Sequence, residues 1–203
     1  MRNSERVRIR EVNTLSDDWY LLKKTTFDYL MRDGSWKTIA RETYDRGNGA
    51  VILPINRERG TILLTRQFRF PAYVNGLEDG MLIEACAGLL DNQSPEEAIR
   101  REAEEELGVN VQEVRKIFES YMSPGSVTEK LFFFVAEYDS PAGATAGNIE
   151  EGEDIEVLEL GLDEALDWVD DGRIQDAKTI ILLLMAQIKG WFRRTVGQIG
   201  NSR

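Results

Sequence analysis

The chain has 203 residues, of which 42% are hydrophobic and 30% charged, so it is long enough for one domain with a buried core. Its formal net charge of −11 argues against nonspecific binding to nucleic acid, which needs a positive surface. The sequence contains no histidine, which excludes Ser-His and Cys-His catalysis and histidine-ligated zinc, and leaves oxygen ligands for a hard cation such as Mg²⁺ or Mn²⁺.

The first 45 residues are predicted to form an extension of β-strands. Apolar and polar residues alternate over residues 7–12, 19–30 and 36–44, and many of them are β-branched or aromatic. Such an extension can pack on its own domain or pair with a second subunit, and the sequence alone leaves both open. We therefore expect an extension at residues 1–45 and a main domain at residues 46–203.

The main domain is predicted to be mixed α/β. Short apolar runs indicate strands, longer periodic runs indicate helices, and a Gly/Ala/Glu-rich loop separates two of the strands at residues 139–154. Strands are expected at residues 50–55, 61–65, 82–87, 111–122, 131–138 and 155–160, and helices at residues 94–107, 163–169 and 176–192.

Cysteine usage and hydropathy predict a cytoplasmic protein. The single cysteine, Cys86, cannot form an intramolecular disulfide, and no charged-then-apolar leader precedes the first strand. The longest apolar run, residues 180–186, is too short to span a bilayer. We expect no membrane partner and no nucleic-acid partner.

The helix at residues 94–107 has well-defined ends. Ser94, Pro95 and Glu97 form an N-cap, a proline in the first turn and a capping box, and Gly108 can adopt the left-handed turn that ends a helix. Between these ends, apolar residues recur on one face and predict a buried stripe. This helix is the most clearly predicted element of the chain.

Three carboxylates near the end of this helix are costly for its stability. Glu102, Glu105 and Glu106 share one face, where like charges cost roughly 0.2–0.5 kcal/mol per pair. The helix dipole adds roughly 0.3–1 kcal/mol for each carboxylate at the C-terminal end. A solvated acidic face is the plain interpretation in a chain with 36 acidic residues; a site for a divalent cation is the functional one.

The residues around these carboxylates resemble the Nudix box, Gly-x5-Glu-x7-Arg-Glu-U-x-Glu-Glu-x-Gly-U, in which U is apolar. Gly88 matches its glycine, and residues 101–109 match its second half. The box places 14 positions between its glycine and its arginine, whereas here 101 − 88 = 13, and Gln93 or Ser94 stands in the region of its first glutamate. The shortening lies before the carboxylate helix and leaves the helix motif intact.

The resemblance implies a fold, a cofactor and a chemistry. The fold would be the Nudix fold, a mixed β-sheet sandwiched between helices, and the reaction would be Mg²⁺-dependent hydrolysis of a diphosphate. Glu102, Glu106 and the carbonyl of Ala87 would be metal ligands, with Glu105 beside them, and Arg101 would orient Glu102; an ordinary surface ion pair is the alternative for Arg101. In the acidic loop, Glu153 best matches a glutamate that acts as metal ligand or general base.

The similarity extends over roughly residues 15–190 and is closest to the GDP-mannose pyrophosphatase branch, next to the ADP-ribose pyrophosphatases. It rests on four stretches: residues 44–50, 66–69, 84–92 and 121–125. The residues 87–92, Ala-Gly-Leu-Leu-Asp-Asn, are its most specific mark. The implied substrate is a nucleoside diphosphate sugar, with GDP-mannose hydrolysed to GMP and mannose 1-phosphate.

The branch implies substrate-binding residues and a homodimer with an intertwined N-terminal region. The implied substrate contacts are Trp19, Arg41, Glu42, Arg69, Ala87, Gly88 and Glu129. Arg69 would hold phosphate through its planar guanidinium, and Trp19 would stack on the base, although a packed strand residue is equally compatible with the sequence. Hydrolysis of ADP-ribose or another ADP-sugar, and a non-catalytic domain that senses nucleotide sugars, are the alternatives.

Overall fold

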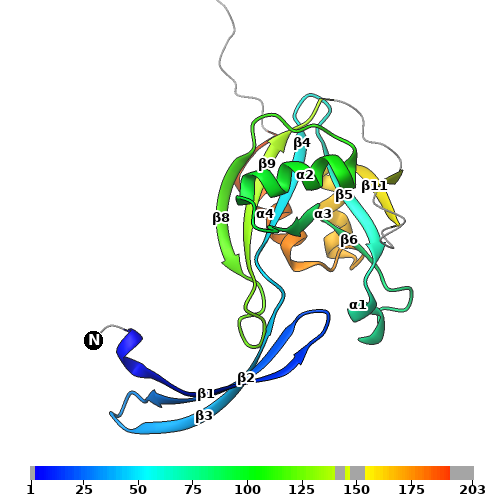
Figure 1. Cartoon of the computed structure of the whole chain (residues 1–203). Helices are drawn as coiled ribbons and strands as arrows, with labels where there is room; N and C mark the ends of the chain where they lie inside the picture. Colours follow the sequence, from blue (N-terminus) through cyan, green and yellow to red (C-terminus); the bar gives the residue numbers. More distant parts are fainter. Residues whose placement is uncertain (1–2, 140–144, 147–153, 193–203) are drawn as a thin grey trace, which may run out of the picture. The chain divides into compact units, whose positions relative to one another are not determined.

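The computed structural model describes residues 3–139, 145–146 and 154–192 (Figure 1). The chain divides into two compact units. The first contains Met1–Gly49 and Glu119–Leu131, and the second contains Ala50–Phe118 and Phe132–Arg203. The expected division into residues 1–45 and 46–203 took no account of residues 119–131 and stays a prediction.

The first unit is built on a three-stranded antiparallel sheet, β1-β2-β3, preceded by a short 3-10 helix (Asn3–Arg6). Its strands are β1 (Val7–Asp17), β2 (Leu21–Leu30) and β3 (Trp36–Asp45). All three were expected from their alternating residues, although β1 is longer than predicted. Residues 119–131 join this unit where Tyr44 forms backbone hydrogen bonds with Ser126 and Thr128.

The second unit contains most of a larger sheet, which has eight strands within the described ranges. The order β10-β11-β5-β4-β9-β8 forms the main path, with β6 paired to β5 and β7 paired to β4. The strands are β4 (Gly49–Asn56), β5 (Thr61–Phe68), β6 (Met81–Glu84), β7 (Ala87–Leu89), β8 (Arg115–Tyr121), β9 (Lys130–Glu137), β10 (Thr145–Ala146) and β11 (Ile155–Gly161).

Helices cover this sheet. Figure 1 shows α2 (Pro95–Leu107) crossing in front of the central strands, with α3 (Leu162–Asp170) and α4 (Ala177–Lys189) behind them. The expected mixed α/β architecture, with a sheet between helices and an N-terminal strand extension, is confirmed. No helix in the described ranges combines the length and hydropathy needed to cross a membrane.

The core of the second unit explains why α2 forms where the sequence predicted it. Ala98, Ile99, Ala103 and Leu107 are fully buried along one stripe of the helix. Ile99, Ala103 and Leu107 belong to one core cluster with residues of the sheet and with Cys86, which lies between β6 and β7. The capping box at the start of the helix is present, and Gly108 ends it with φ at 66°. The buried stripe therefore fixes which face of α2 carries the carboxylates.

Some predicted elements were wrong in extent. The expected strand at residues 82–87 is two strands, because Ala85 donates its backbone N–H to the Thr179 hydroxyl at 2.6 Å instead of continuing the ladder. The short helix α1 (Phe70–Val74) was not predicted, and β8 starts four residues later than expected. The last helix ends at Lys189, because Gly190 adopts a left-handed conformation with φ at 61°.

Candidate functional site

The carboxylates of α2 differ sharply in their surroundings. Glu106 is buried, with 6% of its surface exposed, and the side chain of Glu102 is 13% exposed. The side chain of Glu105 is 54% exposed and pairs with Arg101, whose Nη1 donates to its carboxylate at 2.7 Å. Glu102 and Glu106 therefore form the inner part of the predicted cluster, and Glu105 lies at its outer edge.

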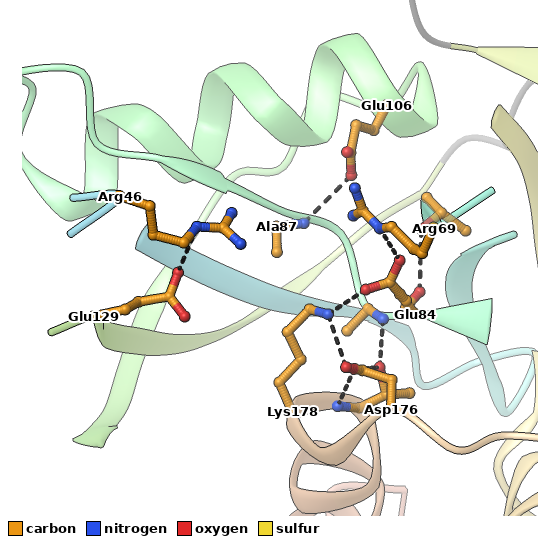
Figure 2. A network of polar contacts seen from close by, with 11 residues as sticks. Arg46, Arg69, Glu84, Ala87, Glu106, Glu129, Asp176 and Lys178 are labelled. Atoms are coloured by element: carbon orange, nitrogen blue, oxygen red, sulfur yellow. Dashed lines mark hydrogen bonds and ion pairs between the residues drawn. The ribbon is translucent and has the colours of Figure 1, made fainter. Parts of the chain in front are cut away.

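Glu106 faces the start of β7. The backbone N–H of Ala87 donates to its carboxylate at 3.3 Å (Figure 2). The pKa of Glu106 is raised to about 7, chiefly by burial and also by the nearby Glu102 charge, although the Cys86 thiol and the Ala87 N–H lower it. The charge of Arg69 lowers the pKa of Glu106 by less than burial and the Glu102 charge raise it, so a divalent cation would suit these two carboxylates.

Gly88 is required by the position of Glu102. A Cβ atom at position 88 would lie 2.0 Å from Oε1 of Glu102, so the carboxylate occupies the space that any side chain would fill. Arg101 holds the same carboxylate from the other side, with Nη2 donating to Oε1 at 2.8 Å. The glycine and the arginine of the box thus serve the placement of one carboxylate.

The shortened loop before α2 supplies other partners for Arg101. Its Nε donates to the side chain of Gln93 at 3.3 Å, and its Nη2 lies 3.6 Å from Asp91. Asp91 and Asn92 have positive φ values of 44° and 66°, which belong to a tight turn. Asp91 and Gln93 therefore contact Arg101 in the region where the Nudix box has its first glutamate.

Arg69, which Figure 2 shows beside Glu106, belongs to an ion network centred on the buried carboxylate of Glu84. Nε of Arg69 donates to Oε2 of Glu84 at 2.6 Å, and the ammonium group of Lys178 donates to Oε1 (Figure 2). Lys178 also lies 2.9 Å from Asp176, which caps the start of α4 through the backbone N–H of Thr179. Arg69 was predicted from the sequence as a site residue, whereas Glu84, Lys178 and Asp176 were not.

The remaining expected substrate contacts belong to the first unit. Glu129 lies 3.4 Å from Nε of Arg46 (Figure 2). Arg41 and Glu42 border a cavity of about 580 Å³ with residues of the 121–128 loop. Trp19 is 81% exposed and touches Tyr20 edge-on, so it is not packed within a strand and is free to stack on a ligand.

The predicted metal site is only partly represented among the described residues. Glu153 lies outside them, so its expected role as ligand or base has no structural counterpart here. Within the described ranges, no group of three or more acidic or thiol side chains is arranged closely enough to hold a metal ion. The assignment of Ala87, Glu102, Glu106 and Glu153 as metal ligands therefore stays a prediction.

Two family models match the chain. The GDP-mannose pyrophosphatase NudK N-terminal domain matches residues 6–44, and the NUDIX domain matches residues 45–183. A GDP-mannose pyrophosphatase of Pectobacterium atrosepticum is 56% identical over 191 residues, which are 94% of this chain and 99% of that protein. One of Yersinia enterocolitica is 55% identical over 186 residues, which are 91% of this chain and 97% of that protein.

A solved structure is similar across the whole fold. A crystal structure titled as an ADP compounds hydrolase has a TM-score of 0.70 and covers 93% of this chain and 97% of its own. Its sequence is 19% identical to this chain, so the comparison establishes the fold alone.

Proposed function

The chain belongs to the Nudix family, in its GDP-mannose pyrophosphatase branch, and we propose that it hydrolyses GDP-mannose to GMP and mannose 1-phosphate. The observation that carries this proposal is the 56% identity to a GDP-mannose pyrophosphatase over 94% of the chain. In the reaction, an oxygen of water forms a bond to one phosphorus, the bridging P–O bond breaks, and the proton of the water is released to a base.

Nudix enzymes typically depend on a divalent metal ion, and we propose Mg²⁺, with Mn²⁺ as a substitute. Glu102, Glu106 and the carbonyl of Ala87 would hold it, which fits a buried Glu106 with a raised pKa beside a half-buried Glu102. The chemistry supplied by the bound cation is neutralisation of the diphosphate charge and activation of water. Arg101 would fix the Glu102 carboxylate by its 2.8 Å hydrogen bond.

The substrate contacts expected from the sequence are retained as proposals. Arg69 would hold a phosphate through its terminal nitrogens, because its hydrogen bond to Glu84 uses Nε. Ala87 and Gly88 would line the same site as Arg69, and Glu129 would contact the substrate. We propose that Glu153 or Glu105 accepts the proton of the attacking water.

We also propose a cytoplasmic homodimer in which Trp19, Arg41 and Glu42 contact the nucleotide. The exposed ring of Trp19 supports a stacking role, and the cavity beside Arg41 and Glu42 supports a binding role. Each of these residues can be replaced separately without disturbing a buried core.

A substrate panel tests the proposal. Purified protein is incubated with GDP-mannose, ADP-ribose or ADP-glucose, with and without Mg²⁺, and the products are separated by anion-exchange chromatography. We expect GMP and mannose 1-phosphate from GDP-mannose only when Mg²⁺ is present, with slower cleavage of the ADP-sugars. Faster cleavage of ADP-ribose would replace the substrate, and binding of GDP-mannose without turnover would favour a sensing domain.

A further inference from the structure

Glu84 is a buried carboxylate with a separate cation on each oxygen. Its side chain is 5% exposed, Oε2 accepts from Nε of Arg69 at 2.6 Å, and Oε1 accepts from Lys178. Charges at such a site are stabilised only when paired and hydrogen-bonded, so both contacts are strongly favoured. The carboxylate therefore restricts Arg69 to one orientation.

That orientation matters because Arg69 lies between two carboxylates. Figure 2 shows its guanidinium with Nε toward Glu84 and the terminal nitrogens on the Glu106 side. The charge of Glu106 also acts on Arg69. Without Glu84, the side chain of Arg69, which is 41% exposed, would be drawn to Glu106, the carboxylate whose charge acts on it most strongly after that of Glu84.

We propose that Glu84 is a positioning residue that acts through Arg69. By engaging Nε, it keeps the guanidinium from forming an ion pair with Glu106 and directs the two terminal nitrogens toward a phosphate of the substrate. Lys178 pairs with the second carboxylate oxygen of Glu84, so that this carboxylate stays ionised and fixed. This inference rests on the proposed hydrolysis of GDP-mannose, and it assigns a task to Glu84 and Lys178, which were not among the site residues predicted from the sequence.

A purely structural role for Glu84 is the competing explanation. The network also joins β6 to the start of α4, through Lys178 and Asp176, and a loss of that joint would lower stability. Stability and substrate handling must therefore be measured separately. The two explanations differ in whether the effect of Glu84 on turnover depends on Arg69.

The test is a double-mutant cycle with Glu84→Gln and Arg69→Gln, measured with GDP-mannose and Mg²⁺. Loss of a charge-assisted hydrogen bond predicts that Glu84→Gln lowers kcat/KM by about 10- to 100-fold, mainly through KM. In the Arg69→Gln background, the same change is expected to lower kcat/KM by less than about twofold, because the positioned group is already absent. Equal effects in both backgrounds would overturn the proposal.

A matched substitution elsewhere controls for stability. Glu159 also accepts a hydrogen bond from an arginine, Arg59, at 3.0 Å, but it pairs near the opposite end of β5 from Arg69. We expect Glu159→Gln to lower the thermal unfolding midpoint while KM for GDP-mannose stays unchanged. A similar rise in KM for both variants would show that general destabilisation explains the result.

The double variant Glu84→Gln/Lys178→Met keeps the test decisive if the single Glu84 variant fails to fold. Removing the carboxylate together with its second cation leaves no unpaired ammonium group in the core. Compared with Lys178→Met alone, it is expected to show a further rise in KM of about tenfold or more. Equal KM values would overturn the proposal, and absence of GDP-mannose hydrolysis by the unmutated protein would instead reject the proposed function.

Discussion

The chemistry proposed for this protein depends most on one side chain, Glu106. It is buried beside Glu102, and burial is the main cause that raises its pKa to about 7. Replacing it by glutamine keeps the shape and leaves an acceptor for the Ala87 N–H, while removing the charge that would hold a cation. We therefore expect the Mg²⁺-dependent kcat to fall by about 100-fold or more.

The same substitution should not weaken the fold. Because the buried charge is lost, the desolvation cost falls, and the thermal unfolding midpoint is expected to stay equal or to rise. Unchanged turnover in Glu106→Gln would place the reaction at another site. A lowered midpoint together with lost activity would mean that Glu106 supports structure rather than metal binding.

Gly88 offers a second test of the same site. A methyl group at position 88 would lie 2.0 Å from Oε1 of Glu102, and the end of that side chain is the part able to move. We expect Gly88→Ala to displace the Glu102 carboxylate and to raise the Mg²⁺ concentration needed for half-maximal activity by about 10- to 100-fold. Gly161→Ala is the control, because a Cβ there meets nothing within 4 Å. Equal magnesium requirements would contradict the assigned role.

For single residues, the predicted and observed placements of side chains agree only where the residue belongs to a sequence motif. The positions of Glu102, Glu105 and Glu106 on one helical face follow from helical spacing. The separation of exposed Glu105 from buried Glu106 does not, because it depends on what packs above each residue. Glu84 was overlooked within an apolar stretch, since its partner Lys178 lies 94 positions away in the sequence.

The ends of α2 are set by local interactions, and they can be tested separately from the site. The hydroxyl of Ser94 accepts from the backbone N–H of Glu97 at 3.3 Å, and the Glu97 carboxylate accepts from Ser94. Ser94→Ala is expected to lower the free energy of unfolding by about 1 kcal/mol, with kcat unchanged. Urea unfolding and steady-state kinetics measure the two quantities. A large loss of kcat would mean that the cap also positions the carboxylates.

The junction between β6 and α4 should respond to acid. Although burial raises it, the charges of Lys178 and Arg69 bring the pKa of Glu84 below its usual value of 4.5. The stabilisation from this ionised group is present above pH 4.5 and is lost as the pH falls toward the lowered pKa. We expect the unfolding free energy of the unmutated protein to fall more steeply below pH 4.5 than that of Glu84→Gln. Parallel pH profiles in urea unfolding would contradict this.

Elements were predictable where periodicity and end signals coincided. Helix α2 combines a capping box, a buried stripe and a terminal glycine, and its bounds were predicted correctly. The break between β6 and β7 depends on the Thr179 hydroxyl, which reaches Ala85 from the other end of the chain. The hydropathy of residues 82–87 does not indicate that contact, so one continuous strand was expected there.

At the scale of the whole molecule, the strands of the N-terminal extension were predictable from the sequence. The later chain segment that joins this unit was not. Its three strands have clear alternation, whereas residues 119–131 comprise the end of β8, the loop that follows and the start of β9, and join it through backbone hydrogen bonds to Tyr44. Backbone pairing of this kind is indifferent to side-chain type, so the sequence gives no indication of it.

The exposed strand β1 of the extension is the expected interface between two copies of the chain. Every residue of β1 is exposed, including Val7, Ile9 and Val12, at 41%, 61% and 52%. Apolar side chains gathered on an exposed strand favour an interface, and a second copy of this chain is the partner that the proposed homodimer supplies. We expect Ile9→Glu to convert a dimer into a monomer in light scattering coupled to size-exclusion chromatography. Ile188→Glu, at a residue 74% exposed on α4, should leave the dimer intact. The reverse pattern would move the interface from β1 to α4.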